Sequence, residues 1–314
     1  MTRAQVLITC PQMQNCIDPF RPRFSEQEIE ITMPDVVQQP TEDELIAIIG
    51  GFDGMIAGDD PLTARVLEHA TRMRIISKWG VGVDGIDLVA AQEHGIKVTN
   101  TPGVFGDDVA DVAAAYLVML ARQLHRIDAS VRSGGWFKFE GQTLAGKTLG
   151  VIGFGTIGKA VGRRGHGFGM RVVAHDVTLA AQATAGAMGC EVLARDRVFV
   201  ESDFVVICAP LTPETRHLVD ERTLALMRPG AFLVNVSRGP VVDEAALADA
   251  LDSGRLAGAA LDVFEEEPLP ADSPLRGFEH CVFGSHNGSN TREGVLRAST
   301  VAVDHLLEEL VRVR

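Results

Sequence analysis

The stretch TLGVIGFGTIG, residues 148–158, joins an apolar run to three spaced glycines. The apolar residues 149–152 predict a buried strand. Gly153 permits a tight turn, Gly155 lets the backbone approach a pyrophosphate, and Gly158 lets the following helix pack closely on the strand. The N-terminus of that helix offers N–H groups and a partial positive charge to phosphates. The stretch therefore predicts a turn that binds a dinucleotide.

Asp176 ends the next apolar run, MRVVAHD. A carboxylate at this position accepts hydrogen bonds from the adenosine ribose hydroxyls and repels a 2′-phosphate, and no arginine occurs in the following DVTLAA. We therefore expect NAD rather than NADP, although a solvated aspartate at a strand end is the alternative for Asp176 taken alone. Thr156 and Ile157 complete the expected phosphate turn.

The helix after this turn continues into GRRGHGFGM and carries several further glycines, at Gly162, Gly165, Gly167 and Gly169. Each glycine inside a helix costs about 0.8–1 kcal/mol relative to alanine. Either this helix is short or poorly stable, or its packing requires glycine, and the sequence leaves both interpretations open.

Strand-like and helix-like runs alternate on both sides of the turn. Before it, the runs QVLIT, GMIAG, MRIISK and IKVT predict strands, and TEDELIAIIGGF predicts a helix that Thr41 and Glu44 begin with a capping box. After it, strands are predicted at DFVVICAP, AFLVNVS, GAALDVF and CVFGSH, and a helix closes the chain. This alternation predicts an α/β fold with two Rossmann-like, doubly wound parallel-sheet domains.

Composition limits the functional classes. The 314 residues suggest about two domains, and the formal net charge of −13 argues against nucleic acid or an anionic membrane as partner. The five cysteines are scattered without CxxC spacing, so neither a disulfide framework nor a metal site is expected. The N-terminus has too short an apolar run for a signal peptide, and no apolar stretch of about 20 residues occurs. We therefore expect a cytoplasmic protein.

Several later segments carry a resemblance to a known family. VVICAPLTPETRHLVDERTLALMRPGAFLVNVSRGPVVDEAALADAL, GAALDVFEEEP and SHNGSNTREG closely resemble the D-isomer-specific 2-hydroxyacid dehydrogenases, and KWGVGVDGID extends the resemblance toward the N-terminus. That family includes D-3-phosphoglycerate dehydrogenases, glyoxylate/hydroxypyruvate reductases and D-lactate dehydrogenases. The resemblance implies a substrate-binding domain of residues 1–101 and 288–314, an NAD-binding Rossmann domain of residues 102–287, and an active site in the cleft between them.

The same resemblance implies three catalytic residues. Arg238, in NVSRG, pairs with the substrate carboxylate and polarises the carbonyl, while His286, in GSHNG, donates and accepts the proton. Glu267, the last glutamate of EEEP, orients the histidine and favours its charged form. His280 is a rival on spacing alone, but the family motif HxGxxTxE selects His286. Ser285 departs from the proline that commonly precedes this histidine, and this departure either loosens the loop or changes which face meets the substrate.

Cofactor contacts carry over in the same way. The resemblance implies them for Cys208, Ala209, Pro210, Thr215, Val236, Ser237, Arg238, Asp262, His286 and Gly288. For Asp262 the implied partner is the nicotinamide carboxamide, with a turn cap as the alternative. Glu265 and Glu266 have no counterpart in the family and are expected to be solvated.

The N-terminal domain contributes KWGVGVDGID. Its glycines predict a turn whose backbone N–H groups bind the substrate carboxylate, and we assign this to Val81 and Gly82. Lys78 either meets a phosphate or second anionic group of the substrate or is simply solvated, and both remain open. Trp79 is expected in the core rather than in a pocket wall.

Together these features imply an NAD-dependent D-2-hydroxyacid dehydrogenase that acts on a small anionic 2-hydroxy or 2-oxo acid, with 3-phosphoglycerate as one candidate. A glyoxylate/hydroxypyruvate reductase is the alternative within the class, and an NAD-sensing, corepressor-like binding protein is the alternative from another class. Because the chain stops soon after its closing helix, no C-terminal regulatory domain is expected. An alanine-rich helix at residues 107–125, expected to be buried on several sides, and an aromatic arm with Trp136 and Phe137 suggest a homodimer.

Overall fold

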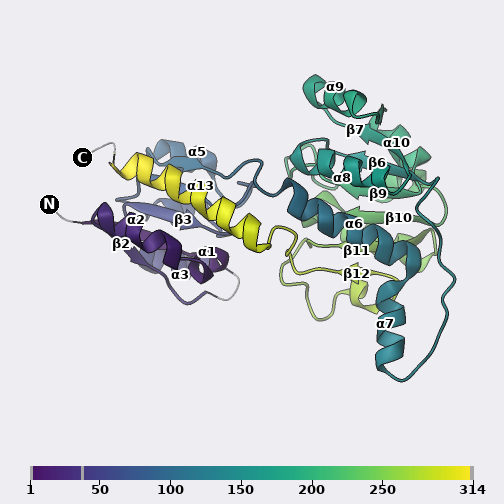
Figure 1. Ribbon diagram of the computed structural model, residues 1–314. Helices are drawn as coiled ribbons and strands as arrows, with labels where there is room; N and C mark the ends of the chain where they lie inside the picture. The colour runs from purple at the N-terminus through teal and green to yellow at the C-terminus, as the bar shows by residue number, and fades with distance from the viewer. Residues whose placement is uncertain (1–2, 37–38, 312–314) are drawn as a thin grey trace. The chain divides into compact units, whose positions relative to one another are not determined.

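The computed structural model describes residues 3–36 and 39–311. They form two compact units, one of Met1–Val104 with Asn290–Arg314 and one of Phe105–Ser289 (Figure 1). Each unit is built on its own sheet, and every strand pair within both sheets is parallel. The expected class, two Rossmann-like parallel-sheet α/β domains, is confirmed.

The sheet of the first unit has the order β2-β1-β3-β4-β5. Its strands are β1 (Ala4–Ile8), β2 (Ile29–Thr32), β3 (Gly54–Ala57), β4 (Ile75–Lys78) and β5 (Lys97–Thr99). The sequence pattern missed β2 because its segment IEIT alternates apolar and polar residues over only four positions. The order reverses between β1 and β3, so the loops after these strands diverge at the carboxyl edge of the sheet, where ligands bind in open α/β folds.

Helices cover this sheet. They are α1 (Pro11–Asn15), α2 (Arg21–Glu26), α3 (Glu42–Ile48), α4 (Ala64–Leu67), α5 (Leu88–Glu93) and α13 (Arg292–Val311), with short 3-10 turns at Asp18–Phe20 and Ile49–Gly51. The capping box of Thr41 and Glu44 is present at the start of α3. Figure 1 shows α13 lying across the sheet, where Leu306 and Leu310 pack on the bare backbone of Gly54. The chain therefore returns to the first unit to bury its sheet.

The sheet of the second unit has the order β12-β11-β10-β9-β6-β7-β8. Its strands are β6 (Thr148–Ile152), β7 (Arg171–His175), β8 (Glu191–Val192), β9 (Phe204–Ile207), β10 (Ala231–Asn235), β11 (Leu256–Leu261) and β12 (Val282–Phe283). The two-residue strand β8 was not predicted, since it is too short for a pattern. The order reverses between β6 and β9, which places the glycine turn after β6 at the switch point of the sheet.

The helices of this unit are α6 (Gly106–Arg122), α7 (Leu124–Arg132), α8 (Thr156–Gly167), α9 (Leu179–Ala187), α10 (Arg195–Glu201), α11 (Glu221–Leu226) and α12 (Glu244–Asp252), with 3-10 turns at Gly239–Val241 and Pro274–Gly277. The predicted helix at 107–125 is α6, and a left-handed Gln123 with a φ of 54° ends it and starts α7. One stripe of α6, formed by Asp107, Asp111, Ala115 and Arg122, is exposed, while its other faces are buried or half-buried.

Two glycines of α8, Gly162 and Gly165, serve close packing. The helix runs for 12 residues, so it is not short. A Cβ on Gly165 would lie 2.5 Å from Cδ2 of Leu149 in the neighbouring strand β6, and one on Gly162 would lie 3.2 Å from the ring of Phe154. Figure 1 shows α6 beside α8, which Arg164 joins by hydrogen bonds to Asp111. Close packing therefore accounts for Gly162 and Gly165, whereas a Cβ on Gly167 would meet nothing within 4 Å and Gly169 lies beyond the helix with a φ of 72°.

Two further features of the described residues concern the surface. Trp136 and Phe137 are 80% and 69% exposed in the segment after α7. Among the described residues, no helix is both long enough and apolar enough to cross a lipid bilayer.

Candidate active site

The turn after β6 is formed as the glycine motif predicts. Gly153 has a φ of 88°, and a Cβ there would lie 2.6 Å from the backbone nitrogen of Ala209, in the loop after β9. A Cβ on Gly158 would overlap the carbonyl oxygen of Gly153. Gly155 is exposed, precedes α8 as its N-cap, and has open space around its Cβ position. A pyrophosphate therefore fits over Gly155, against the N–H groups that begin α8 at Thr156.

Asp176 is bound to this turn. Its Oδ2 accepts a hydrogen bond from the backbone N–H of Phe154 at 2.7 Å, and its Oδ1 accepts from the N–H and hydroxyl of Thr178 at 2.8 and 2.9 Å. Burial acts to raise the pKa of Asp176, but the hydrogen bonds from Thr178 and Phe154 outweigh it, so the pKa lies below its usual value. The side chain is therefore an ionised, half-buried acceptor beside the phosphate turn, which fits the ribose of NAD. The alternative interpretation, that Asp176 is only a solvated aspartate at a strand end, is therefore not supported.

The loop after β9 carries four of the predicted cofactor residues. Ala209 is buried against Gly153, and Pro210 is exposed. Burial raises the pKa of the Cys208 thiol to about 12, so this group is neutral. The hydroxyl of Thr215 donates to the carbonyl of Pro210 at 2.6 Å and accepts from the N–H of Thr212 at 2.7 Å. Thr215 thus shapes its own loop, and its contact with the cofactor remains a prediction.

Arg238 lies in the loop after β10, next to the buried residues Val236 and Ser237. Asn235, which ends β10, holds this loop: its Oδ1 accepts from the N–H and hydroxyl of Ser237, and its Nδ2 donates to the carbonyl of Arg238 at 2.9 Å. The guanidinium Nη1 of Arg238 donates to the carbonyl of Ser237 at 2.9 Å. Asn235 was not among the predicted site residues, although a polar residue at the end of the apolar run AFLVN was a usable signal.

His286 and Glu267 form a direct pair. Nδ1 of His286 lies 2.8 Å from Oε2 of Glu267, and both side chains are 23% exposed. The other carboxylate oxygen of Glu267 accepts from the N–H of Phe264 at 3.0 Å. Gly239 packs against the backbone of Phe264. A Cβ on Gly239 would overlap the carbonyl group of Phe264. The loops after β10 and β11 are therefore in backbone contact, and His286 follows β12, the next strand in the sheet.

The loop around His286 is organised by Asp262, which is 3% exposed. Its Oδ1 accepts from the hydroxyl of Tyr116 at 3.2 Å and from the N–H of Asn287 at 3.3 Å, and its Oδ2 accepts from the N–H of Gly288 at 2.9 Å. Its backbone carbonyl accepts from the N–H of His286 at 2.6 Å. Asp262 therefore caps this turn, and Gly288 is part of the cap. Contacts of the two residues with nicotinamide remain predictions.

The other histidine and the other glutamates of this region have different surroundings. His280 precedes β12, whereas His286 follows it, and burial lowers the pKa of His280 below its usual value. Glu265 is exposed, which agrees with the expected solvated side chain, and its Oε1 lies 2.9 Å from Nε2 of His217. Glu266 is exposed.

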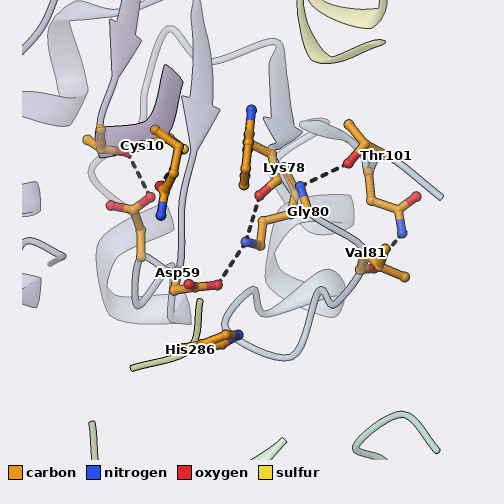
Figure 2. Close-up of polar contacts among 12 residues, drawn as sticks. Cys10, Asp59, Lys78, Gly80, Val81, Thr101 and His286 are labelled. Atoms are coloured by element: carbon orange, nitrogen blue, oxygen red, sulfur yellow. Dashed lines mark hydrogen bonds and ion pairs between the residues drawn. The ribbon is translucent and has the colours of Figure 1, made fainter. Parts of the chain in front are cut away.

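The turn predicted to bind the substrate carboxylate lies after β4 in the first unit (Figure 2). Gly80 has a φ of 138°, and it exchanges two hydrogen bonds with Thr101, whose hydroxyl accepts from the Gly80 N–H at 3.0 Å. The carbonyl of Val81 accepts from the amide of Asn100 at 2.7 Å. Within the part of the chain that the structure describes, no acceptor contacts the N–H groups of Val81 and Gly82. These two N–H groups could bind an anion. The predicted role of Val81 and Gly82 in binding the substrate carboxylate remains a prediction.

Lys78 is buried and paired. It is 5% exposed, and its Nζ donates to Oδ1 of Asp59 at 2.9 Å and to the carbonyl of Trp79 at 3.1 Å (Figure 2). The alternative of a solvated Lys78 is therefore wrong. Trp79 is 5% exposed and donates its indole N–H to the hydroxyl of Ser299, which agrees with a core position.

A pair of polar side chains that was not predicted lies at the switch point of the first sheet. The hydroxyl of Thr9, after β1, donates to Oδ2 of Asp60, after β3, at 2.7 Å. Burial raises the pKa of Asp60 to about 6, and no described residue hydrogen-bonds to its Oδ1. The segment GDD directly after the apolar run GMIA was a signal that could have drawn attention to Asp59 and Asp60.

Comparison with known proteins agrees with this geometry. The family described as D-isomer specific 2-hydroxyacid dehydrogenase, NAD binding domain, matches residues 114–288. The chain is 44% identical to a glyoxylate reductase of Thermococcus litoralis over 86% of this chain and 84% of the relative. It is 35% identical to a D-3-phosphoglycerate dehydrogenase of Methanocaldococcus jannaschii over 98% of this chain and 57% of the relative. The structure is similar to that of a D-lactate dehydrogenase from Aquifex aeolicus complexed with NAD and lactic acid, with a TM-score of 0.84, 27% identity and coverage of 98% and 95%.

The chain therefore belongs to the D-isomer specific 2-hydroxyacid dehydrogenase family. It is an NAD-dependent oxidoreductase that acts on the CH–OH group of hydroxy acids.

Proposed function

We propose that this protein reversibly reduces a small 2-oxo acid to the D-2-hydroxy acid, with Arg238, His286 and Glu267 as its catalytic residues. The observation that carries this proposal is the 2.8 Å hydrogen bond between His286 and Glu267. It forms at the carboxyl edge of the same parallel sheet that carries the Gly153 turn, and catalytic groups of open α/β sheets gather at this edge.

Each side chain has a separate task. The planar guanidinium of Arg238 binds the substrate carboxylate and polarises the adjacent carbonyl. His286 gives a proton to the carbonyl oxygen during reduction and takes it back during oxidation, through Nε2, the ring nitrogen that does not contact Glu267. Glu267 holds Nδ1, fixes the ring orientation and favours the imidazolium. When bound, NADH supplies the hydride.

The state of Lys78 bears on the choice of acid. A phosphorylated substrate needs a cation that is available to its second anionic group, but Lys78 is buried and already neutralised by Asp59. We therefore propose an unphosphorylated substrate, glyoxylate or hydroxypyruvate, rather than the 3-phosphoglycerate couple. The name of the Thermococcus litoralis relative, a glyoxylate reductase, supports the same choice.

A substrate panel tests the proposal. Glyoxylate, hydroxypyruvate, phosphohydroxypyruvate and pyruvate are each offered with NADH, and oxidation of NADH is followed by absorbance. We expect the highest kcat/KM with glyoxylate or hydroxypyruvate. A higher value with phosphohydroxypyruvate would overturn the choice of acid. Tight NADH binding without turnover of any acid would overturn the enzymatic function and favour an NAD-sensing binding protein.

We also propose a cytoplasmic homodimer. The dimer is supported by the exposure of Trp136 and Phe137, because aromatic side chains exposed together mark protein interfaces. The five free thiols support a reducing compartment. Sedimentation of the purified protein tests the dimer, and a monomer at micromolar concentration would contradict it.

A further inference from the structure

We propose that Tyr116 is a positioning residue for His286, acting through Asp262, which holds the turn that presents the imidazole to Glu267. This inference rests on the proposed function insofar as His286 is taken as the proton donor. Tyr116 lies on α6, and the histidine lies in the loop after β12. Asp262, at the end of β11, is the residue that contacts both.

His286 has a backbone conformation that needs external support. Its φ of 54° lies in the left-handed region, which residues with a Cβ adopt rarely. The preceding Ser285 is exposed and has no ring to restrict its backbone. The turn is held instead by three consecutive N–H groups, those of His286, Asn287 and Gly288, which all donate to Asp262. The direction of the imidazole therefore depends on the orientation of Asp262.

Tyr116 in turn fixes the carboxylate of Asp262. Its hydroxyl donates to Oδ1 at 3.2 Å, and the side chain is only 8% exposed. Burial, together with the negative charge of Asp262, raises the pKa of Tyr116, so its hydroxyl stays protonated and can donate. Without this donor, a buried carboxylate would lose a hydrogen bond and gain freedom to rotate.

Packing makes the pair sensitive to small displacements. A Cβ on Gly284 would overlap both the hydroxyl of Tyr116 and Oδ1 of Asp262, and one on Gly288 would lie 2.9 Å from Oδ2. The backbone on both sides of His286 thus rests directly on the Tyr116–Asp262 pair. A shift of the pair must move the loop, and misplacing a catalytic group by about 1 Å can cost a large factor in rate.

The test is Tyr116→Phe, which removes one hydroxyl and keeps the ring. The matched control is Ser202→Ala, which removes another buried hydroxyl of the same unit, one that donates to the carbonyl of Val198 at 2.6 Å. We expect Tyr116→Phe to lower kcat about 10-fold, with little change in NADH affinity. Ser202→Ala should leave kcat unchanged even if it lowers the melting temperature. Equal kcat in both variants would overturn the proposal.

A second readout does not depend on turnover. The imidazole of His286 is titrated by NMR in the protein without substrate, and its signal is assigned by its loss in His286→Asn. Because a well-placed carboxylate favours imidazolium, Tyr116→Phe should lower the titration midpoint, and Ser202→Ala should not. An unchanged midpoint would contradict the positioning role. If the wild type reduces no 2-oxo acid while the midpoint shifts as expected, the proposed function fails and the positioning role stands.

A double variant locates the effect. Asp262→Asn weakens the group that accepts the hydrogen bond of Tyr116. In that background, Tyr116→Phe should alter kcat by less than about 2-fold, because the effects of mutations at two coupled residues do not add. A full 10-fold loss in that background would show that Tyr116 acts by a route other than Asp262.

Discussion

Nδ1 of His286 lies 2.8 Å from Oε2 of Glu267, although the two residues are 19 positions apart in the chain. They meet because β11 and β12 are neighbouring parallel strands, whose carboxyl ends open on the same edge of the sheet. The second oxygen of Glu267 is occupied by the N–H of Phe264, so the carboxylate has a fixed direction toward the imidazole.

Removing the charge of this carboxylate should impair proton transfer. We expect Glu267→Gln to lower kcat for oxo-acid reduction by about 10- to 100-fold, in line with the usual range for a lost general acid–base element. Since the carboxylate favours the imidazolium, the pH profile of reduction should also move to lower pH. Steady-state rates across pH 5–9 measure both effects. Glu266→Gln, which changes the exposed neighbour, is the control and should behave as wild type.

Arginine and lysine should not be interchangeable at position 238. A lysine keeps the charge but cannot bind a carboxylate with two parallel hydrogen bonds. We expect Arg238→Lys to lower kcat/KM by at least about 100-fold, the effect of losing one charged hydrogen-bonding partner in the transition state, while calorimetry finds NADH affinity little changed. Turnover like that of wild type would count against the assigned role. Arg228→Lys, at an exposed ion pair with Asp203, controls for the substitution itself.

Asp176 should govern cofactor affinity and choice. We expect Asp176→Asn to weaken NADH binding by about 10-fold, the usual effect of losing a charged hydrogen-bond acceptor, and to narrow the preference for NADH over NADPH because a repulsive charge is removed. Titration with both cofactors measures this. Asp196→Asn removes an exposed carboxylate paired with Arg222 and should leave both affinities unchanged. An unaltered preference in Asp176→Asn would contradict the prediction.

The packing of α8 on β6 predicts opposite effects for two glycines of one helix. Gly165→Ala places a Cβ 2.5 Å from Leu149 and should lower the free energy of unfolding by about 1–3 kcal/mol, as overpacking does. Gly167→Ala meets nothing within 4 Å and should be neutral or raise stability by up to about 1 kcal/mol, since alanine favours the helix. Chemical denaturation compares the two. If Gly165→Ala were as stable as wild type, α8 would be able to move away from β6 without a cost in free energy, and the prediction would fail.

Asp60 should make stability depend on pH in an unusual direction. Burial raises its pKa to about 6, above the value near 3.8 for an unperturbed carboxyl. The folded state therefore binds more protons than the unfolded state between these values, and stability falls as pH rises from about 4 to 6. The loss amounts to about 3 kcal/mol at most, for a shift of about two pKa units.

Asp60→Asn removes this titration. The free energy of unfolding of wild type minus that of the variant should therefore decrease as pH rises from 4 to 7, as followed by urea denaturation at each pH. A difference that stays constant over this range would contradict a raised pKa. Thr9→Val, which removes the hydroxyl that donates to Asp60, should raise its pKa further and move the transition to higher pH.

The fold and the cofactor turn were accessible from the sequence because their signals are local. Gly153, Gly155 and Gly158 occupy fixed positions around one strand end, and the apolar runs identify strands without reference to their neighbours. The capping box of Thr41 and Glu44 is local in the same way. Where the local signal was short, as in β2 and β8, the prediction failed.

The sequence by itself determined two parallel-sheet domains, a dinucleotide turn and the residue types of the site. Only the tertiary structure decided that Lys78 is neutralised by Asp59, and that two glycines of α8 serve packing. It also decided that Tyr116 and Asp262 support the loop of His286. The reason is physical: a residue's contacts across a sheet depend on strand order and helix placement, which bring together residues such as Tyr116 and Asp262 that are 146 positions apart. No pattern within a single segment of the chain encodes such a contact.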